Sequence, residues 1–316
     1  MAPPLIAIVG PTASGKSSLA LRLARAHRGE IVSCDSLQVY RGLDIGSAKA
    51  TVEERREVRH HLIDVVDPGA LFSAAEYARL ARAAVAEITG RGRLPIVAGG
   101  TGLYLKALLE GLFDGPARDE ARRRRLEGLA ERLGDERVHR LLGRLDPKAA
   151  ARIRPRDRVR IVRALEVYWA TGRPISDQQR AGAEPLSGHR VFLVGLAPDR
   201  DALRRVVERR TRAMLEGGLV EEVRGLLDQG YGPELRPLQA IGYREAVAVI
   251  RGEMTPEEAE QAIVTATMRF AKRQMTWFRH QADVTWFTDP DDAYAAAEEW
   301  LRAHAGAGKT GPSAES

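Results

Sequence analysis

The sequence lacks the features of secreted and membrane proteins. Cys34 is the only cysteine in 316 residues, which excludes an intramolecular disulfide and makes the reducing cytoplasm the expected location. No run of about 18 apolar residues occurs, so we expect no membrane span. The first apolar run has neither a basic flank nor a cleavage-like site, so we expect no signal peptide.

Negative charge is too scarce to balance the basic residues. The chain has 49 Lys and Arg against 43 Asp and Glu, a net charge of +6. Between Pro116 and Arg173 alone there are 17 basic and 9 acidic residues, so this stretch carries +8 and the rest of the chain −2. Positive charge concentrated in this way suits a polyanionic partner such as a nucleic acid.

The first part of the chain alternates between strand-like and helix-like patterns. Continuous apolar runs predict strands, and apolar residues at helical spacing predict helices between them. This alternation is typical of a parallel sheet with helices on both faces, an α/β fold. The predicted strands span residues 5–9, 31–34 and 94–98, and the predicted helices 17–27, 73–90 and 101–112. Ser73 is the predicted N-cap of the second of these helices.

The pattern changes after residue 117. Strand signals vanish, and Arg-rich helical periodicity continues to about Arg180, which predicts an all-helical insertion. The runs VFLVGLAP, near 191–198, and VTWF, near 284–287, return to strand character and are predicted to rejoin the sheet. The predicted domains are a first core part at 1–117, the insertion at 118–185, a mostly helical second core part at 186–303 and a disordered tail at 304–316.

The stretch GPTASGKS fits the pattern G-x-x-x-x-G-K-[ST] at every fixed position, between a predicted strand and a predicted helix. Its glycines let backbone N–H groups converge on phosphate oxygens, and the helix N-terminus adds positive potential. Lys16 supplies a point charge and Ser17 a hydroxyl for Mg²⁺. We therefore predict a phosphate-binding loop, made of Gly10, Pro11, Thr12, Ala13, Ser14, Gly15, Lys16 and Ser17.

Two polar residues follow other predicted strands. In a parallel sheet the carboxyl ends of neighbouring strands line one crevice, so Asp35 and Thr101 are expected beside the phosphate-binding loop. Asp35 suits a general base, a water-mediated Mg²⁺ ligand or a cap of the following turn. Thr101, in AGGTGLY, follows two glycines that allow a close backbone approach, and its alternative role is a helix N-cap.

Three functions are compatible with these residues. In a small-molecule or nucleoside kinase the loop would hold ATP, Asp35 would activate an acceptor hydroxyl, and the helical insertion would be a lid. In an alkyl transferase the loop would hold the diphosphate of the donor, which then becomes the leaving group. A nucleotide-gated RNA-binding switch is the third, and it leaves the convergence of polar groups on one point unexplained.

Six blocks of the sequence resemble the tRNA dimethylallyltransferase family, also called tRNA isopentenyltransferases. In order they are GPTASGKS, DSLQVYRGLDIGSAK, HHLIDVVDP, AGGTGLYLKALLEG, RALEVYWATGRP and AKRQMTWFR. The resemblance runs from about Ile6 to Phe287, nearly the whole chain. The resemblance implies a P-loop core with a helical insertion. It also implies transfer of a dimethylallyl group from dimethylallyl diphosphate to N6 of adenosine 37, next to the tRNA anticodon, so the phosphates are a leaving group.

The resemblance also implies roles for single residues. Lys16 and the loop amides would hold the diphosphate, and Ser17 its Mg²⁺. Asp35 would be the general base for the adenine amine, and Thr101 would line the reaction channel. Arg210 falls where the family has a diphosphate-binding arginine, with Arg209 and Arg212 as neighbouring alternatives.

The expected partners are the tRNA anticodon stem-loop and dimethylallyl diphosphate, with no membrane, and the chain is expected to be a monomer. Val159 departs from the polar residue typical of its position, and Gln239 and Ala240 replace a basic and a small residue. The implied tRNA contacts are Asp35, Ser36, Leu37, Gln38, Thr101, Arg123, Val159, Arg160, Ile161, Val162, Arg163, Gln239, Ala240, Ile241, Gly242, Tyr243 and Arg244.

Overall fold

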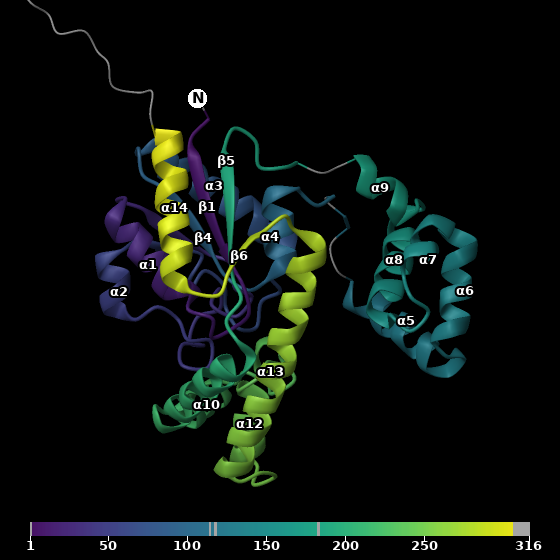
Figure 1. The fold of residues 1–316 in the computed structure, drawn as a ribbon. Coiled ribbons are helices and arrows are strands. Elements are labelled where there is room, and N and C mark those ends of the chain that lie inside the picture. The colour runs from purple at the N-terminus through teal and green to yellow at the C-terminus, as the bar shows by residue number, and fades with distance from the viewer. Residues whose placement is uncertain (1, 114, 117–118, 182–183, 306–316) are drawn as a thin grey trace, which may run out of the picture. The chain divides into compact units, whose positions relative to one another are not determined.

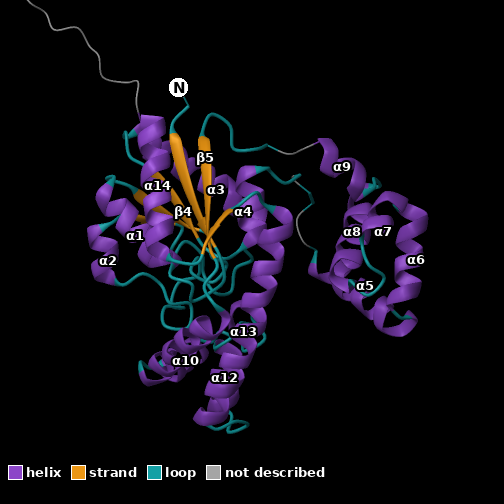
Figure 2. Ribbon diagram, viewed as in Figure 1, coloured by secondary structure: helices purple, strands orange, loops and turns teal. Residues whose placement is uncertain are grey.

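One all-parallel sheet organises the larger part of the computed structural model, which describes residues 2–113, 115–116, 119–181 and 184–305. Within these residues six strands are paired in the order β3-β2-β4-β1-β5-β6. Figure 1 labels β1, β4, β5 and β6 of this sheet, and Figure 2 shows strands in orange among the helices. The predicted α/β fold is therefore confirmed. The strands are β1 (Pro4–Val9), β2 (Glu30–Ser33), β3 (His60–His61), β4 (Pro95–Ala98), β5 (Arg190–Leu196) and β6 (Thr285–Phe287).

Helices cover both faces of this sheet, as continuous apolar strands require. On one face Ile6 and Ile8 of β1 pack in one cluster with α1 (Lys16–Ala26) and α14 (Pro290–Ala305). The residues that alternate with them, such as Leu5 and Ala7, are also buried. Helix α3 (Ala74–Gly90) contacts β2 and β4, and α4 (Gly102–Leu109) follows β4. Helix α3 begins after its predicted cap, Ser73, whose Oγ accepts from the Glu76 N–H.

Helix α14 was not predicted. It buries Ala293, Ala297 and Leu301 against the sheet, and Trp300 stacks on Phe192 of β5. The predicted disordered tail was therefore wrong at residues 304–305, which belong to this helix. The rest of that tail, residues 306–316, lies outside the described residues.

A second group of helices follows β5 and lies beyond the carboxyl ends of the strands (Figure 2). Helices α10 (Arg200–Glu216) and α13 (Pro256–Gln281) pack through a small apolar cluster that includes Val207 and Ala271. Ala13 of the phosphate-binding loop packs against the same cluster. Between them come α11 (Leu219–Asp228), a 3-10 turn (Arg236–Gln239) and α12 (Tyr243–Ile250). None of the described helices is long and apolar enough to cross a membrane.

Helix α2 (Val52–Glu57) also belongs to the unit that contains the sheet. Another set of helices forms a separate compact unit, Leu109–Leu186, called here the helical unit. Its start lies before the predicted boundary at residue 118. Buried Leu126, Leu142 and Leu165 belong to its own core. Asp146 caps one helix by accepting from the Ala149 N–H at 2.9 Å and also accepts from the Ser176 hydroxyl at 2.7 Å. The helices are α5 (Glu120–Leu133), α6 (Asp135–Leu145), α7 (Pro147–Arg152), α8 (Arg158–Thr171) and α9 (Ile175–Ala181).

Candidate active site

The loop between β1 and α1 has the backbone of a phosphate cradle. Gly10 has φ 143° and Gly15 has φ 91°, where glycine meets no steric penalty. A Cβ atom on Gly10 would lie 2.5 Å from the Leu196 carbonyl oxygen, so only glycine fits. Gly15 precedes α1 without a side-chain cap. The N–H groups at the start of α1 are therefore available to an anion.

Ser14 supports this interpretation independently of the motif. Its Oγ atom is buried and has no hydrogen-bond partner among the described residues. A buried hydroxyl without a partner is costly, so such an atom in a native loop indicates a ligand or water that completes it. A phosphate oxygen would accept a hydrogen bond from the Ser14 hydroxyl.

Lys16 is the first residue of α1 and lies near the end of this loop. Its Nζ donates to the Pro11 carbonyl oxygen at 2.5 Å. Burial lowers the pKa of Lys16 from 10.5 to about 8; the Asp35 carboxylate opposes this change and the Arg210 guanidinium adds to it. Burial likewise lowers the pKa of Arg210, and Asp35 opposes that shift. These effects indicate that the Asp35 carboxylate lies within electrostatic reach of both Lys16 and Arg210.

The three arginines considered for diphosphate binding differ in position. Arg210 is partly buried and close enough to Asp35 and Lys16 for charge coupling. Arg209 is exposed, and Arg212 is exposed and forms an ion pair with Glu260 at 3.0 Å. Of the three, Arg210 is the one whose charge is coupled to Lys16 of the phosphate-binding loop.

Asp35 follows β2 and shapes the turn after it. Its Oδ1 accepts from the Leu37 N–H at 2.8 Å and more weakly from the Gln38 N–H at 3.4 Å. The capping role considered from the sequence is thus present, but it uses one oxygen. Within the described part of the chain Oδ2 accepts no hydrogen bond, so it remains available to a substrate N–H. Burial raises the pKa of the adjacent Cys34 thiol to about 12, which keeps this side chain neutral.

Thr101 is joined to the Asp35 turn. Its Oγ1 accepts from the Ser36 N–H at 3.1 Å, and its own N–H donates to the Cys34 carbonyl oxygen at 3.2 Å. The glycines around it explain this approach, because a Cβ on Gly99 would lie 2.1 Å from that same carbonyl oxygen. The structure therefore brings Asp35 and Thr101 together, as expected for residues that follow the carboxyl ends of neighbouring parallel strands.

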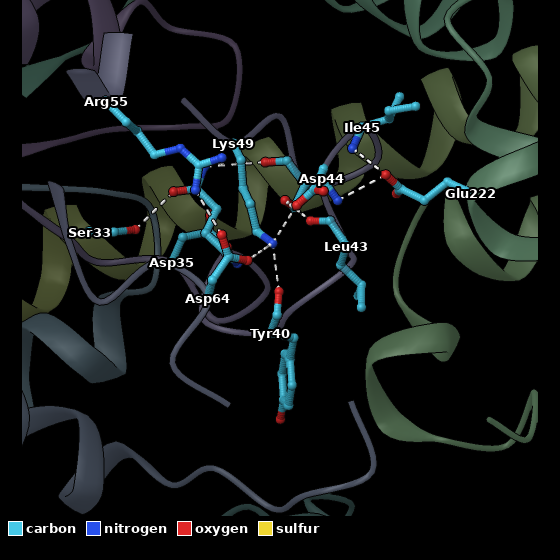
Figure 3. A network of polar contacts seen from close by, with 12 residues as sticks. Ser33, Asp35, Tyr40, Leu43, Asp44, Ile45, Lys49, Arg55, Asp64 and Glu222 are labelled. Carbon is cyan, nitrogen blue, oxygen red and sulfur yellow. Dashed lines mark hydrogen bonds and ion pairs between the residues drawn. The ribbon is translucent and has the colours of Figure 1, made fainter. Parts of the chain in front are cut away.

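The loop after Asp35 is held by a network of charges that sequence reasoning missed (Figure 3). Lys49, whose side chain is 2% exposed, donates to Asp64, to Asp44 at 2.7 Å and to the Tyr40 carbonyl oxygen at 2.6 Å. Asp64 also binds Arg55 at 2.7 Å. The DIGSAK part of the sequence thus stabilises the loop that carries Asp35.

Glu222, on α11, stabilises the same loop through hydrogen bonds to its backbone. Its carboxylate accepts from the backbone N–H groups of Asp44 at 2.9 Å and Ile45 at 2.7 Å, and from the Tyr243 hydroxyl at 2.9 Å. Tyr243 fills the space that a side chain on Gly46 would need. No motif marks Glu222, so only the structure could reveal it.

Several of the residues implied as tRNA contacts have internal roles. Tyr243 is fully buried, and Ile161 and Val162 lie in the core of the helical unit. Their side chains pack inside the protein, which leaves contacts in these segments to exposed neighbours such as Arg160 and Arg244. The Gln38 side chain is also bound internally, because its Nε2 donates to the Ala48 carbonyl oxygen at 3.2 Å.

The other implied contacts in the helical unit and the QAIGYR segment vary in exposure. Val159 is 66% exposed. Arg123 binds Glu127 at 2.9 Å, and Arg163 binds Glu166 at 2.9 Å. In QAIGYR, Gln239 is exposed, Ala240 and Ile241 are half-buried and Gly242 is buried.

The fold and the phosphate site define a P-loop protein, and comparison with known sequences gives its family. Residues 38–281 match the family described as IPP transferase. The chain is also 50% identical over 287 residues to a protein of Solibacter usitatus named tRNA dimethylallyltransferase, covering 90% of this chain and 93% of the relative. The chain therefore belongs to the IPP transferase family.

Solved structures agree with this assignment. A tRNA isopentenylpyrophosphate transferase from Bacillus halodurans is 41% identical, with a TM-score of 0.68 and coverage of 95% of this chain and 96% of that one. A eukaryotic dimethylallyltransferase described as acting on tRNA is 26% identical, with a TM-score of 0.75 and coverage of 96% and 79%. The resemblance inferred from the six sequence blocks is confirmed.

Proposed function

We propose that this protein transfers a dimethylallyl group from dimethylallyl diphosphate to N6 of the adenosine next to the tRNA anticodon and releases diphosphate. The observation that carries the proposal is the phosphate-binding loop, whose buried Ser14 hydroxyl has no hydrogen-bond partner among the described residues and whose Lys16 is coupled to Asp35 and Arg210. The names of the relatives, including a dimethylallyltransferase acting on tRNA, supply the substrate class.

The diphosphate would bind at the loop. The N–H groups at the start of α1, the Ser14 hydroxyl and Lys16 would contact its oxygens, and Arg210 would approach from α10. As the bond between C1 and its oxygen breaks, negative charge accumulates on the diphosphate, and these fixed donors stabilise that charge.

The residues present also fit a Mg²⁺ ion that arrives with the diphosphate. Ser17, in the first turn of α1, is exposed and offers one hydroxyl oxygen. Among the described residues no three His, Cys, Asp or Glu side chains form a ligand cluster. Mg²⁺ is commonly held in this way, by one or two protein oxygens together with substrate phosphates. When bound, it would neutralise part of the charge on the diphosphate.

Asp35 would act on the other reactant. The exocyclic amine of adenine is a weak nucleophile, and a base that accepts its proton contributes about 10²–10⁴-fold. The nitrogen forms a bond to C1, the electron pair of the broken C–O bond leaves with diphosphate, and the proton passes to Oδ2 of Asp35. Thr101, bonded to the same turn, would orient the amine.

The adenine has to leave the stacked anticodon loop to reach this site, as in other enzymes that modify a base. The helical unit carries the surplus of positive charge, with Arg124, Arg125 and Arg160 exposed. We assign it the binding of the RNA backbone, because phosphate contacts dominate the affinity of such interfaces.

The test is a mass analysis of tRNA nucleosides after incubation with protein, Mg²⁺ and dimethylallyl diphosphate. We expect a five-carbon addition to adenosine, nearly abolished by Asp35→Asn, while tRNA affinity changes little. Transfer of phosphate from γ-labelled ATP to an acceptor would instead favour the kinase. An Asp35→Asn variant that keeps more than half of wild-type turnover would refute the general-base assignment.

A further inference from the structure

Gln274 of α13 connects two parts of the site that are far apart in the sequence. Its Oε1 accepts from the Thr12 N–H in the phosphate-binding loop at 2.9 Å. Its Nε2 donates to the Gly100 carbonyl oxygen, in the turn that carries Thr101, at 2.9 Å. The side chain is 7% exposed, and both ends of the amide are used. A polar side chain buried on a helix is costly unless it is paired in this way.

Helix α13 approaches the turn that carries Thr101 very closely. A Cβ on Gly100 would lie 2.2 Å from the Gln274 Nε2 atom, and one on Gly102 would lie 2.2 Å from a ring carbon of Trp277. Helix α13 therefore lies against both Gly100 and Gly102, the residues on either side of Thr101. Its Ala271 belongs to the apolar cluster on which Ala13 of the phosphate-binding loop packs. One helix thus contacts both the loop for the donor and the turn for the acceptor.

We infer that Gln274 is a positioning residue that sets the separation between the donor's diphosphate and the adenine amine. The inference rests on the proposed function, since it concerns the two reactants of that reaction. The side chain touches neither reactant directly: it fixes the Thr12 amide on one side and the turn before Thr101 on the other. Misplacing reacting groups by about 1 Å costs on the order of 100-fold in rate.

The substitution Gln274→Glu replaces only the amide nitrogen of the side chain with an oxygen, and it tests both hydrogen bonds. A protonated Glu can donate to the Gly100 carbonyl oxygen and accept from the Thr12 N–H, as Gln does. An ionised Glu can only accept, and it repels that carbonyl oxygen. We therefore expect the ratio of variant to wild-type kcat, with both substrates saturating, to rise toward wild type as the pH falls from about 8 to about 5.5. Effects of pH that are common to the variant and the wild-type protein cancel in this ratio.

Two further variants complete the comparison. Gln274→Met keeps the length but makes neither bond, so kcat should fall by about 100-fold with a ratio independent of pH. Gln261→Glu, at an exposed position on the same helix, is the matched control and should show neither effect. A flat ratio for Gln274→Glu, or Gln274→Met with more than half of wild-type kcat, would overturn the inference.

A binding measurement separates this inference from the proposed reaction. Gln274→Met should weaken the affinity for inorganic diphosphate with Mg²⁺ by about tenfold, because the Thr12 amide loses its anchor. If the wild-type protein fails to alkylate tRNA while this tenfold loss is found, the proposed function fails and the positioning of the loop by Gln274 stands. Unchanged diphosphate affinity would refute that positioning whatever the reaction.

Discussion

Lys16 makes the capture of the donor depend on pH in a way that the structure specifies. Burial lowers its pKa to about 8, so in the free enzyme the ammonium group loses its proton within an accessible pH range. The protonated form attracts the diphosphate, and the neutral form does not. Raising the pH above this pKa should therefore weaken productive binding of dimethylallyl diphosphate.

The size of the effect follows from the position of the pKa. One pH unit above a pKa, about a tenth of the group remains protonated, so kcat/KM for the donor at about pH 9 should be about tenfold below its value at pH 7. Once the diphosphate is bound, its negative charge favours the charged Lys16, and kcat should decline only at higher pH. A lysine at its ordinary pKa would show no decline in this range.

Steady-state kinetics at several donor concentrations, with tRNA saturating, measure this dependence. Lys16→Arg is the control, because a guanidinium stays charged throughout and should give lower activity without the decline. The reasoning is refuted if wild-type kcat/KM stays flat between about pH 7 and pH 9, or if Lys16→Arg declines in parallel with wild type.

Two other predictions concern stability and RNA binding. Lys49→Met leaves Asp44 and Asp64 without their buried cation, although Arg55 still pairs with Asp64. We expect this variant to lose about 2–4 kcal/mol in free energy of unfolding. The control, Lys272→Met at an exposed position, should lose under about 0.5 kcal/mol. Urea titration by tryptophan fluorescence in a Trp169→Phe background reports on the unit that contains the sheet, and equal losses in both variants would contradict the prediction. Replacing exposed Arg124 and Arg125 with Gln should reduce the steepness of log affinity for tRNA against log salt concentration by about 1–2. Replacing exposed Arg28 and Arg56 with Gln removes the same amount of charge and should leave this slope unchanged. Equal slopes for the two double variants would remove α5 from the interface.

Local patterns in the sequence predicted much of the fold. The phosphate-binding loop, the cap of α3 at Ser73 and the strands at β1 and β4 depend on neighbouring residues, so their signals are local. Helix α14 has local signals too, with Pro290 first and Asp291 and Asp292 in its first turn. Its buried face includes the small residues Ala293 and Ala297, which give a weak apolar period, and it was missed for that reason.

The residues that hold the site's loops in place could not be predicted, because their hydrogen-bond partners are far away in the sequence. Gln274 reaches Thr12 across 262 residues and Gly100 across 174. Glu222 binds the loop at Asp44 across 178 residues. A single sequence indicates that such residues are polar, but their partners follow only from the packing of α11 and α13 against the loops at the end of the sheet.

The central claim is that the diphosphate of the donor is the leaving group, expelled when the adenine amine forms its bond to C1. The most direct test uses dimethylallyl diphosphate in which the oxygen atom that bridges C1 and phosphorus is a heavy isotope. Mass analysis should find one released diphosphate for each alkylated adenosine, with all the label in the diphosphate. Label retained in the RNA, or alkylated adenosine without an equal amount of diphosphate, would contradict the account.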